Sequence, residues 1–289
     1  MASFLYTKVE AHELLKQLAE RYIFHPQNSK YKLPPSHIAI LEVGAGSGNL
    51  LRELATTYDV MGCGTDPFIT RREEGRIKFL PLKAEEIETL PRRYDLIYSV
   101  HSLHHFSDPK KFLEACNKKL TWEGKVIIVD WNRGAKTGVF EHYYDIQTVE
   151  EWAKLSGLTP IESGTNGQNF FTIFQLTERR VAVASKDGKR IFRGMFGQSP
   201  YFFIYAHTTH TSEIANRGSR IKLKRMVKNR YSKTLQHLKT YDVYNEVAEC
   251  QAIIAKSIGK KGQQRLRELG VRLILNPPEE IEEALKLLY

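Results

Sequence analysis

A glycine-rich segment in the first half of the chain constrains the fold more than any other feature. The apolar run 38–41 leads into Gly44, Gly46 and Gly48, and apolar residues at helical spacing follow from Leu50. This pattern predicts a buried strand, a tight turn and the start of a helix. Glycine lets the backbone approach a ligand closely, and the free N–H groups at a helix start face that ligand. The segment therefore predicts an α/β fold with a ligand site at the end of its first strand.

The spacing of these glycines and the acid before them narrow the class of fold. They read G-x-G-x-G, so the third glycine comes one residue earlier than in the G-x-G-x-x-G pattern of dinucleotide folds. Glu42 lies two residues before Gly44. The segment resembles the first motif of class I S-adenosylmethionine-dependent methyltransferases, E/D-x-G-x-G-x-G. The resemblance implies a seven-stranded Rossmann-like sheet and S-adenosylmethionine as the cofactor.

A second carboxylate lies at the predicted end of the next strand. Asp66 comes 22 residues after Gly44. A carboxylate at this position accepts hydrogen bonds from both hydroxyls of a ribose. Because Pro67 follows, a purely local Asp-Pro turn is the alternative interpretation.

The resemblance assigns further contacts to the cofactor. Glu42 and the glycine loop would hold its amino acid portion, Asp66 its ribose, and the Ala84-Glu85 segment its adenine. Glu85 is equally readable as an exposed carboxylate at a helix start. The complete set of implied cofactor contacts is Glu42, Gly44, Ala45, Gly46, Gly48, Asp66, Pro67, Ala84, Glu85, Ser99, His101 and His104.

Three histidines lie close together at positions 101–105. The segment Leu103–Phe106 resembles the L-H-H-F loop of small-molecule methyltransferases, which lies beside the methyl group. One histidine could act as a general base because its unperturbed pKa is near neutrality; packing of the loop around the cofactor is the alternative. The catalytic candidates are His104, Asp130 and Tyr143, and Tyr143 and Tyr144 could line an acceptor pocket or belong to the core. No metal site is expected, because adjacent positions 104 and 105 do not readily chelate one ion and no Cys or carboxylate cluster accompanies them.

Composition and charge indicate two domains. The 289 residues suffice for one large domain or two medium ones. The net charge of +10 arises entirely from the C-terminal part, because residues 1–178 hold 21 Lys/Arg and 23 Asp/Glu, whereas residues 179–289 hold 22 and 10. No apolar run reaches the length of a membrane span and no signal peptide is recognisable, so a cytoplasmic protein is expected. Three widely spaced cysteines indicate neither disulfides nor zinc.

The segment after residue 178 carries a different set of motifs. It contains V-A-V-A-S-x-D-G from Val181, M-F-G-x-S-P-x-F from Met195, and later I-G and E-A-L segments. These resemble the dinitrogenase iron-molybdenum cofactor-binding family, which implies a smaller α/β domain of ribonuclease H-like topology. Met195 replaces the histidine of the family's H-F-G segment, which argues against binding of that cofactor. The predicted domains are 1–178 and 179–289, the second with a basic insertion near 213–240.

The stretch 217–239 contains nine Lys/Arg and no acid. Such a cluster can bind RNA or another anion, with an affinity that falls steeply with salt. A solvated face is the alternative.

The sequence thus predicts a methyltransferase that uses S-adenosylmethionine and acts on an unidentified acceptor, with a small molecule favoured. An RNA methyltransferase and a non-enzymatic S-adenosylmethionine-sensing regulator are the alternatives. The sequence does not indicate the oligomeric state.

Overall fold

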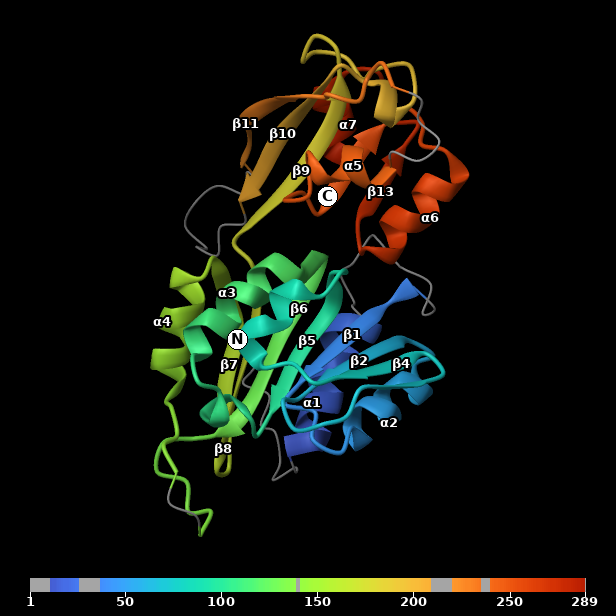
Figure 1. Ribbon diagram of the computed structural model, residues 1–289. Helices are drawn as coiled ribbons and strands as arrows, with labels where there is room; N and C mark the ends of the chain where they lie inside the picture. Colours follow the sequence, from blue (N-terminus) through green and yellow to red (C-terminus); the bar gives the residue numbers. More distant parts are fainter. Residues whose placement is uncertain (1–10, 26–36, 139–140, 209–219, 235–239, 289) are drawn as a thin grey trace. The chain divides into compact units, whose positions relative to one another are not determined.

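The computed structural model describes residues 11–25, 37–138, 141–208, 220–234 and 240–288 (Figure 1). The chain divides into two compact units, Met1–Leu176 and Thr177–Tyr289. Each unit is built around one sheet.

The first unit contains an eight-stranded sheet in the order β3-β4-β2-β1-β5-β6-β8-β7. Strands β4, β2, β1, β5 and β6 run parallel, whereas β3, β8 and β7 pair antiparallel to their neighbours. The bounds are β1 Ala39–Val43, β2 Met61–Thr65, β3 Arg72–Glu74, β4 Ile77–Leu80, β5 Tyr94–Val100, β6 Leu120–Trp131, β7 Leu158–Asn166 and β8 Asn169–Leu176.

The sheet has one strand more than the seven predicted. The additional strand β3 consists of Arg72, Glu73 and Glu74, so it carries no apolar signal. It pairs with β4 across a turn at Gly75, whose φ is 60°, and ion pairs such as Glu73 with Lys78 at 3.1 Å accompany the ladder.

Helices cover both faces of this sheet, so its parallel strands are buried on both sides (Figure 1). On one face lie α1 Ala11–Ala19, which continues as a π-helix over Glu20–Phe24, and α2 Asn49–Thr57. On the other face lie the 3₁₀-helix η3 Ala84–Thr89, α3 Pro109–Lys119 and α4 Ile146–Leu155. The carboxyl ends of β1, β2, β5 and β6 therefore meet at one edge, where a doubly wound sheet binds its ligands.

A carboxylate caps the start of α4. Asp145 is the N-cap, and its Oδ1 accepts the Thr148 N–H at 2.8 Å. A carboxylate at this position satisfies a free N–H group and interacts favourably with the helix dipole.

The second unit contains a five-stranded sheet in the order β11-β10-β9-β12-β13. Strands β9, β10 and β11 are antiparallel, and β12 and β13 run parallel to β9. The strands are β9 Glu178–Ser185, β10 Tyr201–Thr208, β11 Arg220–Lys228, β12 Ala252–Ala255 and β13 Arg272–Leu275; the helices are η5 Phe196–Gln198, α5 Thr240–Asn245, α6 Lys260–Glu268, α7 Ile281–Leu285 and η7 Lys286–Leu288. The core of this unit includes Phe202, Ile204 and Ile253.

The central part of the predicted basic insertion near 213–240 is a strand of this sheet. Residues 220–228 form β11, which pairs with β10 along its length. The sequence did not indicate this strand because its many basic residues give it no apolar pattern. Charged residues are suited to an edge strand, where their side chains reach solvent and keep the exposed backbone from pairing with other chains. Arg217 and Lys239, at the two ends of the basic stretch, lie outside the described residues.

None of the helices formed by the described residues has the length and apolar character needed to span a bilayer.

Candidate functional site

The glycine turn lies where the sequence predicts it, between β1 and α2. Gly44, Gly46 and Gly48 have φ values of 80°, 49° and 77°, a region that disfavours other residues. A Cβ at Gly44 would lie 2.4 Å from the Ser102 Cβ, and a Cβ at Gly48 would lie 2.3 Å from the Phe79 ring. At Gly46, by contrast, no described atom lies within 4 Å of that position. Side chains therefore pack closely against the turn at Gly44 and Gly48, whereas its middle at Gly46 is open. A backbone turn of this shape leaves room for a ligand at Gly46.

Glu42 is a buried acid directly beneath this turn. Only 5% of its surface is exposed, and a hydrogen bond from the Leu51 backbone is the main interaction that favours its ionised form. Its Oε2 atom finds no hydrogen-bond partner among the residues that the structure describes. Burial, with a smaller contribution from Asp66, raises the pKa of Glu42 to about 8. A buried carboxyl group with one unsatisfied oxygen fits a cationic ligand such as an α-ammonium group.

Asp66 follows the end of β2 and touches the glycine turn. Its Oδ2 accepts the Gly46 N–H at 3.1 Å, and its Oδ1 accepts the Phe68 N–H at 2.9 Å. Asp66 therefore shapes the local turn at Pro67, as one interpretation predicts. It also lies at the sheet edge beside the glycine turn, as the ribose interpretation requires, and each carboxylate oxygen has further lone pairs.

The predicted adenine segment begins the 3₁₀-helix η3, where Ala84 is buried. One oxygen of Glu85 is engaged locally, because its Oε1 accepts the Asp108 N–H at 2.8 Å just before α3. Ser99 is buried within β5, and its hydroxyl has no hydrogen-bond partner in the described part of the chain.

The loop after β5 is tied to the glycine turn. Ser102 Oγ lies 3.2 Å from the Gly44 carbonyl oxygen and 3.0 Å from that of Val100. His101 has a φ of 47°, a strained value for a residue with a Cβ. Its ring stacks on Trp131 with centroids 3.9 Å apart, and its Nε2 lies 2.7 Å from Asn169 Oδ1. Burial lowers the pKa of His101.

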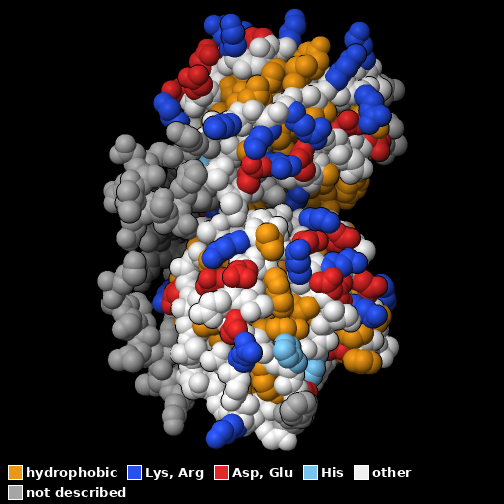
Figure 2. All heavy atoms as spheres, turned by 90° about the vertical axis from the view of Figure 1, so that its left-hand side faces the viewer, with side chains coloured by type: hydrophobic (Ala, Val, Ile, Leu, Met, Phe, Trp, Pro, Cys, Tyr) orange, Lys and Arg blue, Asp and Glu red, His pale blue; other side chains and the backbone are white. Residues whose placement is uncertain are grey.

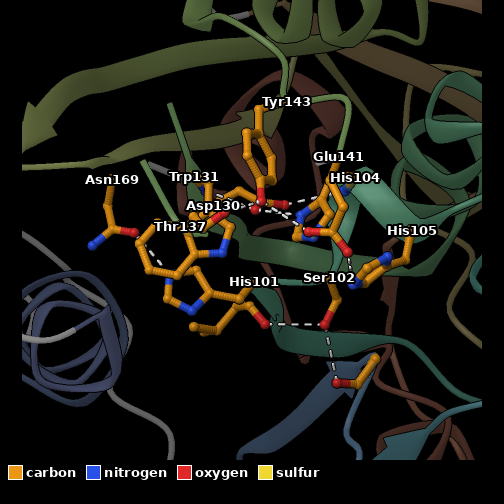
Figure 3. Close-up of polar contacts among 12 residues, drawn as sticks. His101, Ser102, His104, His105, Asp130, Trp131, Thr137, Glu141, Tyr143 and Asn169 are labelled. Atoms are coloured by element: carbon orange, nitrogen blue, oxygen red, sulfur yellow. Dashed lines mark hydrogen bonds and ion pairs between the residues drawn. The ribbon is translucent and has the colours of Figure 1, made fainter. Parts of the chain in front are cut away.

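His104 and Asp130 form a buried pair at the ends of adjacent elements (Figure 3). The Asp130 Oδ1 lies 2.7 Å from the His104 Nδ1, and the Oδ2 accepts the His104 backbone N–H at 3.2 Å. The two side chains are only 3% and 2% exposed. Because a carboxylate accepts the Nδ1 proton, this arrangement leaves Nε2 of a neutral imidazole with a lone pair.

Glu141 joins this group from a distant part of the sequence. Its Oε2 lies 3.5 Å from His104 Nε2, and its Oε1 lies 3.9 Å from His105 Nε2. Tyr143 donates its hydroxyl to Glu141 Oε2 at 2.8 Å, and its ring packs edge-on against His104 with centroids 5.1 Å apart. The sequence predicts no metal site, on the assumptions that His104 and His105 cannot face one ion and that no carboxylate lies near them. The structure contradicts both assumptions, because the two histidines and Glu141 offer ligand atoms within 4.8 Å of one another.

Sequence reasoning missed the partners of these histidines. Glu141 comes 37 residues after His104, and Asn169 comes 68 residues after His101. Neither belongs to a motif. Asn169 reaches the histidine loop because β8 pairs with β6. Glu141 reaches it through the course of the chain after β6.

In the second unit a cavity of about 510 Å³ lies between η5 and the start of α6, and Met195 lines it. Its described lining contains no Cys, His, Asp or Glu, so the residues present do not fit a metal cluster. Two histidines come shortly after Met195 in the sequence: His207 is buried in β10, and His210 lies outside the described residues.

The basic strand β11 is partly neutralised. Lys224 lies 2.8 Å from Glu178, Arg225 pairs with Glu249, and Arg230, just after the strand, lies 2.7 Å from Glu246. Figure 2 shows blue and red side chains intermixed on the face of this unit that it displays. The positive charge available to a polyanion is therefore smaller than the sequence suggests.

A doubly wound sheet with a glycine turn, a buried acid and a carboxylate at the ends of adjacent strands defines an α/β protein suited to an adenosine-containing ligand. Comparison with known proteins narrows this class. Residues 11–178 match the family model "Methyltransferase domain", so the chain belongs to this family. Residues 178–289 match the model "Dinitrogenase iron-molybdenum cofactor". Both predicted resemblances are confirmed. The prediction of S-adenosylmethionine as the cofactor is confirmed together with the first of them.

Similar proteins include two curated relatives, each called ubiquinone biosynthesis O-methyltransferase. The protein from Aliivibrio fischeri (strain MJ11) is 29% identical over 141 residues, covering 46% of this chain and 56% of the relative. The protein from Photobacterium profundum is 33% identical over 110 residues, covering 35% and 47%. The chain thus spans about half the length of the curated relatives it matches. A solved S-adenosylmethionine-dependent methyltransferase from Aquifex aeolicus is 18% identical with a TM-score of 0.41, covering 56% of this chain and 96% of that one.

Proposed function

We propose that this protein transfers the methyl group of S-adenosylmethionine to a hydroxyl oxygen of a small organic acceptor. Membership of the methyltransferase family and the O-methyltransferase names of two relatives support this proposal. One observation carries it: the glycine turn and the His104–Asp130 pair lie at the same sheet edge, and Ser102 links them through its contact with Gly44.

The cofactor would be held by groups from three strand ends. Glu42 would receive the α-ammonium group, because its buried Oε2 lacks a partner in the described structure. The N-terminus of α2, which follows the glycine turn, would face the carboxylate of the cofactor, because a helix start favours an anion. Asp66 would accept the ribose hydroxyls, and Ala84 with Glu85 would border the adenine. The bound cofactor supplies a methyl group already activated by its sulfonium.

The acceptor hydroxyl would lie on the Nε2 side of His104. The hydroxyl oxygen would accept the methyl group, and the electron pair of the carbon–sulfur bond would remain on sulfur. The hydroxyl proton would pass to Nε2, which carries the lone pair in the tautomer that donates Nδ1–H to Asp130. Tyr143, fixed by Glu141 and Thr137, would border the acceptor.

We also propose that residues 1–178 form the methyltransferase domain and residues 179–289 a domain of ribonuclease H-like topology. The second assignment is supported by the strand order β11-β10-β9-β12-β13, in which three antiparallel strands precede two parallel ones.

Two measurements test the proposed function. Calorimetry of the full chain with S-adenosylmethionine and S-adenosylhomocysteine should detect binding of both; binding of neither would refute the cofactor site. Isotope-labelled methyl groups should then enter the small-molecule fraction of a cell extract. Label that appears only in RNA, and disappears after RNase treatment, would refute the small acceptor.

A variant separates binding from chemistry. His104→Gln should lower turnover about 10²- to 10⁴-fold, the range for loss of a general base, while affinity for S-adenosylhomocysteine stays within about twofold. A variant with unchanged turnover would contradict the role of His104.

A further inference from the structure

Three side chains place metal-ligating atoms around one point. His104, His105 and Glu141 each offer one ligand atom, and these atoms all lie within 4.8 Å of one another. The two adjacent histidines lie in the 3₁₀ turn η4 Leu103–His105, and their ring centroids are 4.0 Å apart. Figure 3 shows Glu141 directed toward both rings.

The distances are close to those of a metal site. Ligands 2.0–2.1 Å from a tetrahedral zinc ion lie about 3.3 Å apart. The His104 Nε2 and Glu141 Oε2 atoms are 3.5 Å apart, and the His105 Nε2 and Glu141 Oε1 atoms are 3.9 Å apart. These two contacts involve different oxygens of Glu141, and the three ligand atoms, one from each residue, lie within 4.8 Å of one another. The His105 side chain is 59% exposed, so its ring has room to turn toward the other two ligands.

Two further contacts orient the ligands. Asp130 holds the Nδ1 side of His104, and this carboxylate–histidine arrangement directs Nε2 toward an ion and increases its basicity. Tyr143 holds Glu141 Oε2 at 2.8 Å, and Thr137 holds the Tyr143 hydroxyl at 2.8 Å. His104 and Glu141 are therefore both held in place by hydrogen bonds to neighbouring side chains, unlike exposed groups that lie close together without such support.

We propose that His104, His105 and Glu141 bind a divalent transition-metal ion, with Zn²⁺ as the probe that suits two imidazoles and one carboxylate. Three protein ligands leave one position of the ion open. This is the arrangement of a site that acts on a bound molecule, because purely structural zinc sites have four protein ligands.

The open position gives the ion a role, which rests on the proposed function. An acceptor hydroxyl bound there loses its proton to water more readily, because the cation stabilises the oxygen anion. With the ion on Nε2, this coordination replaces direct proton transfer to His104. The acceptors expected are molecules whose hydroxyl can bind a metal, such as phenols with a neighbouring oxygen.

Metal binding is tested without any acceptor. The full chain, freed of metal with a chelator, is titrated with Zn²⁺ by calorimetry, and Co²⁺ is added in parallel to read its visible absorption. One ion per chain is expected. His105→Ala and Glu141→Gln should each weaken Zn²⁺ binding at least tenfold and change the Co²⁺ spectrum. Asp130→Asn should weaken binding about 10- to 100-fold through His104.

His142→Ala is the matched control, because this exposed histidine neighbours Glu141 but does not belong to the cluster. It should bind Zn²⁺ like the parent chain. Circular dichroism checks that each variant is folded, and His105, being exposed, is the substitution least able to disturb the fold. Absence of Zn²⁺ binding, or equal binding by the parent chain, His105→Ala and Glu141→Gln, would overturn the site. That result leaves the methyltransferase proposal intact if methyl transfer persists, whereas metal binding without cofactor binding refutes only the proposed function.

Discussion

Glu42 should make cofactor binding release a proton. The carboxyl group is buried, and its pKa is raised to about 8, so about nine-tenths of the ligand-free molecules carry the proton at pH 7. A cationic ammonium group beside Oε2 favours the ionised form. Binding of S-adenosylmethionine at pH 7 should therefore release close to one proton.

The assay is calorimetry at pH 7 in buffers with different ionisation enthalpies. The observed enthalpy should vary with the buffer enthalpy, with a slope near one proton. Affinity should rise about tenfold per pH unit between pH 6 and 8 and level off above 8. In Glu42→Gln the slope should vanish, and at pH 9 the affinity should be at least tenfold lower, because a charge-assisted hydrogen bond is lost.

The same group should affect the stability of the ligand-free protein. The folded-state pKa lies above the ordinary value of 4.5, so the stability linked to this proton is full below pH 4.5 and lost as pH rises toward 8. The difference between the two pKa values changes the free energy of unfolding by roughly 5 kcal/mol at most between low and high pH. Urea unfolding should find Glu42→Gln close to the parent chain at pH 4.5 and more stable at pH 9. A pH-independent difference, or proton release that persists in Glu42→Gln, would refute this account of Glu42.

Two further predictions concern the same sheet edge. Asp66→Ala should weaken S-adenosylmethionine binding by about 1–3 kcal/mol, because it removes acceptors for the ribose and the bond to Gly46; an unchanged dissociation constant in calorimetry would contradict both roles. Gly48→Ala should lower the free energy of unfolding by roughly 2–4 kcal/mol, since the new Cβ meets Phe79 at 2.3 Å and φ is 77°. The matched Gly46→Ala substitution meets no described atom and should cost only about 1 kcal/mol, so equal losses in urea unfolding would disprove the steric argument.

The sequence alone was sufficient for the features that are local in the chain. The glycine turn, Glu42 and Asp66 lie at strand ends because apolar runs and breaker residues mark where strands begin and end. The change of charge and motifs after residue 178 separated two segments for the same reason, since composition is a property of each segment by itself. The two family assignments needed nothing more.

Tertiary structure decided everything that depends on pairing between distant segments. Strand β3 exists because a turn at Gly75 returns charged residues to β4, and β11 exists because β10 offers it an edge. Glu141 meets His104 and His105 only through the course of the chain after β6. Hydrophobic periodicity reports which face of an element is buried, but it carries no information about which polar side chains meet at a sheet edge. The sequence therefore identified the cofactor, whereas the polar cluster around His104 became visible only in the folded chain.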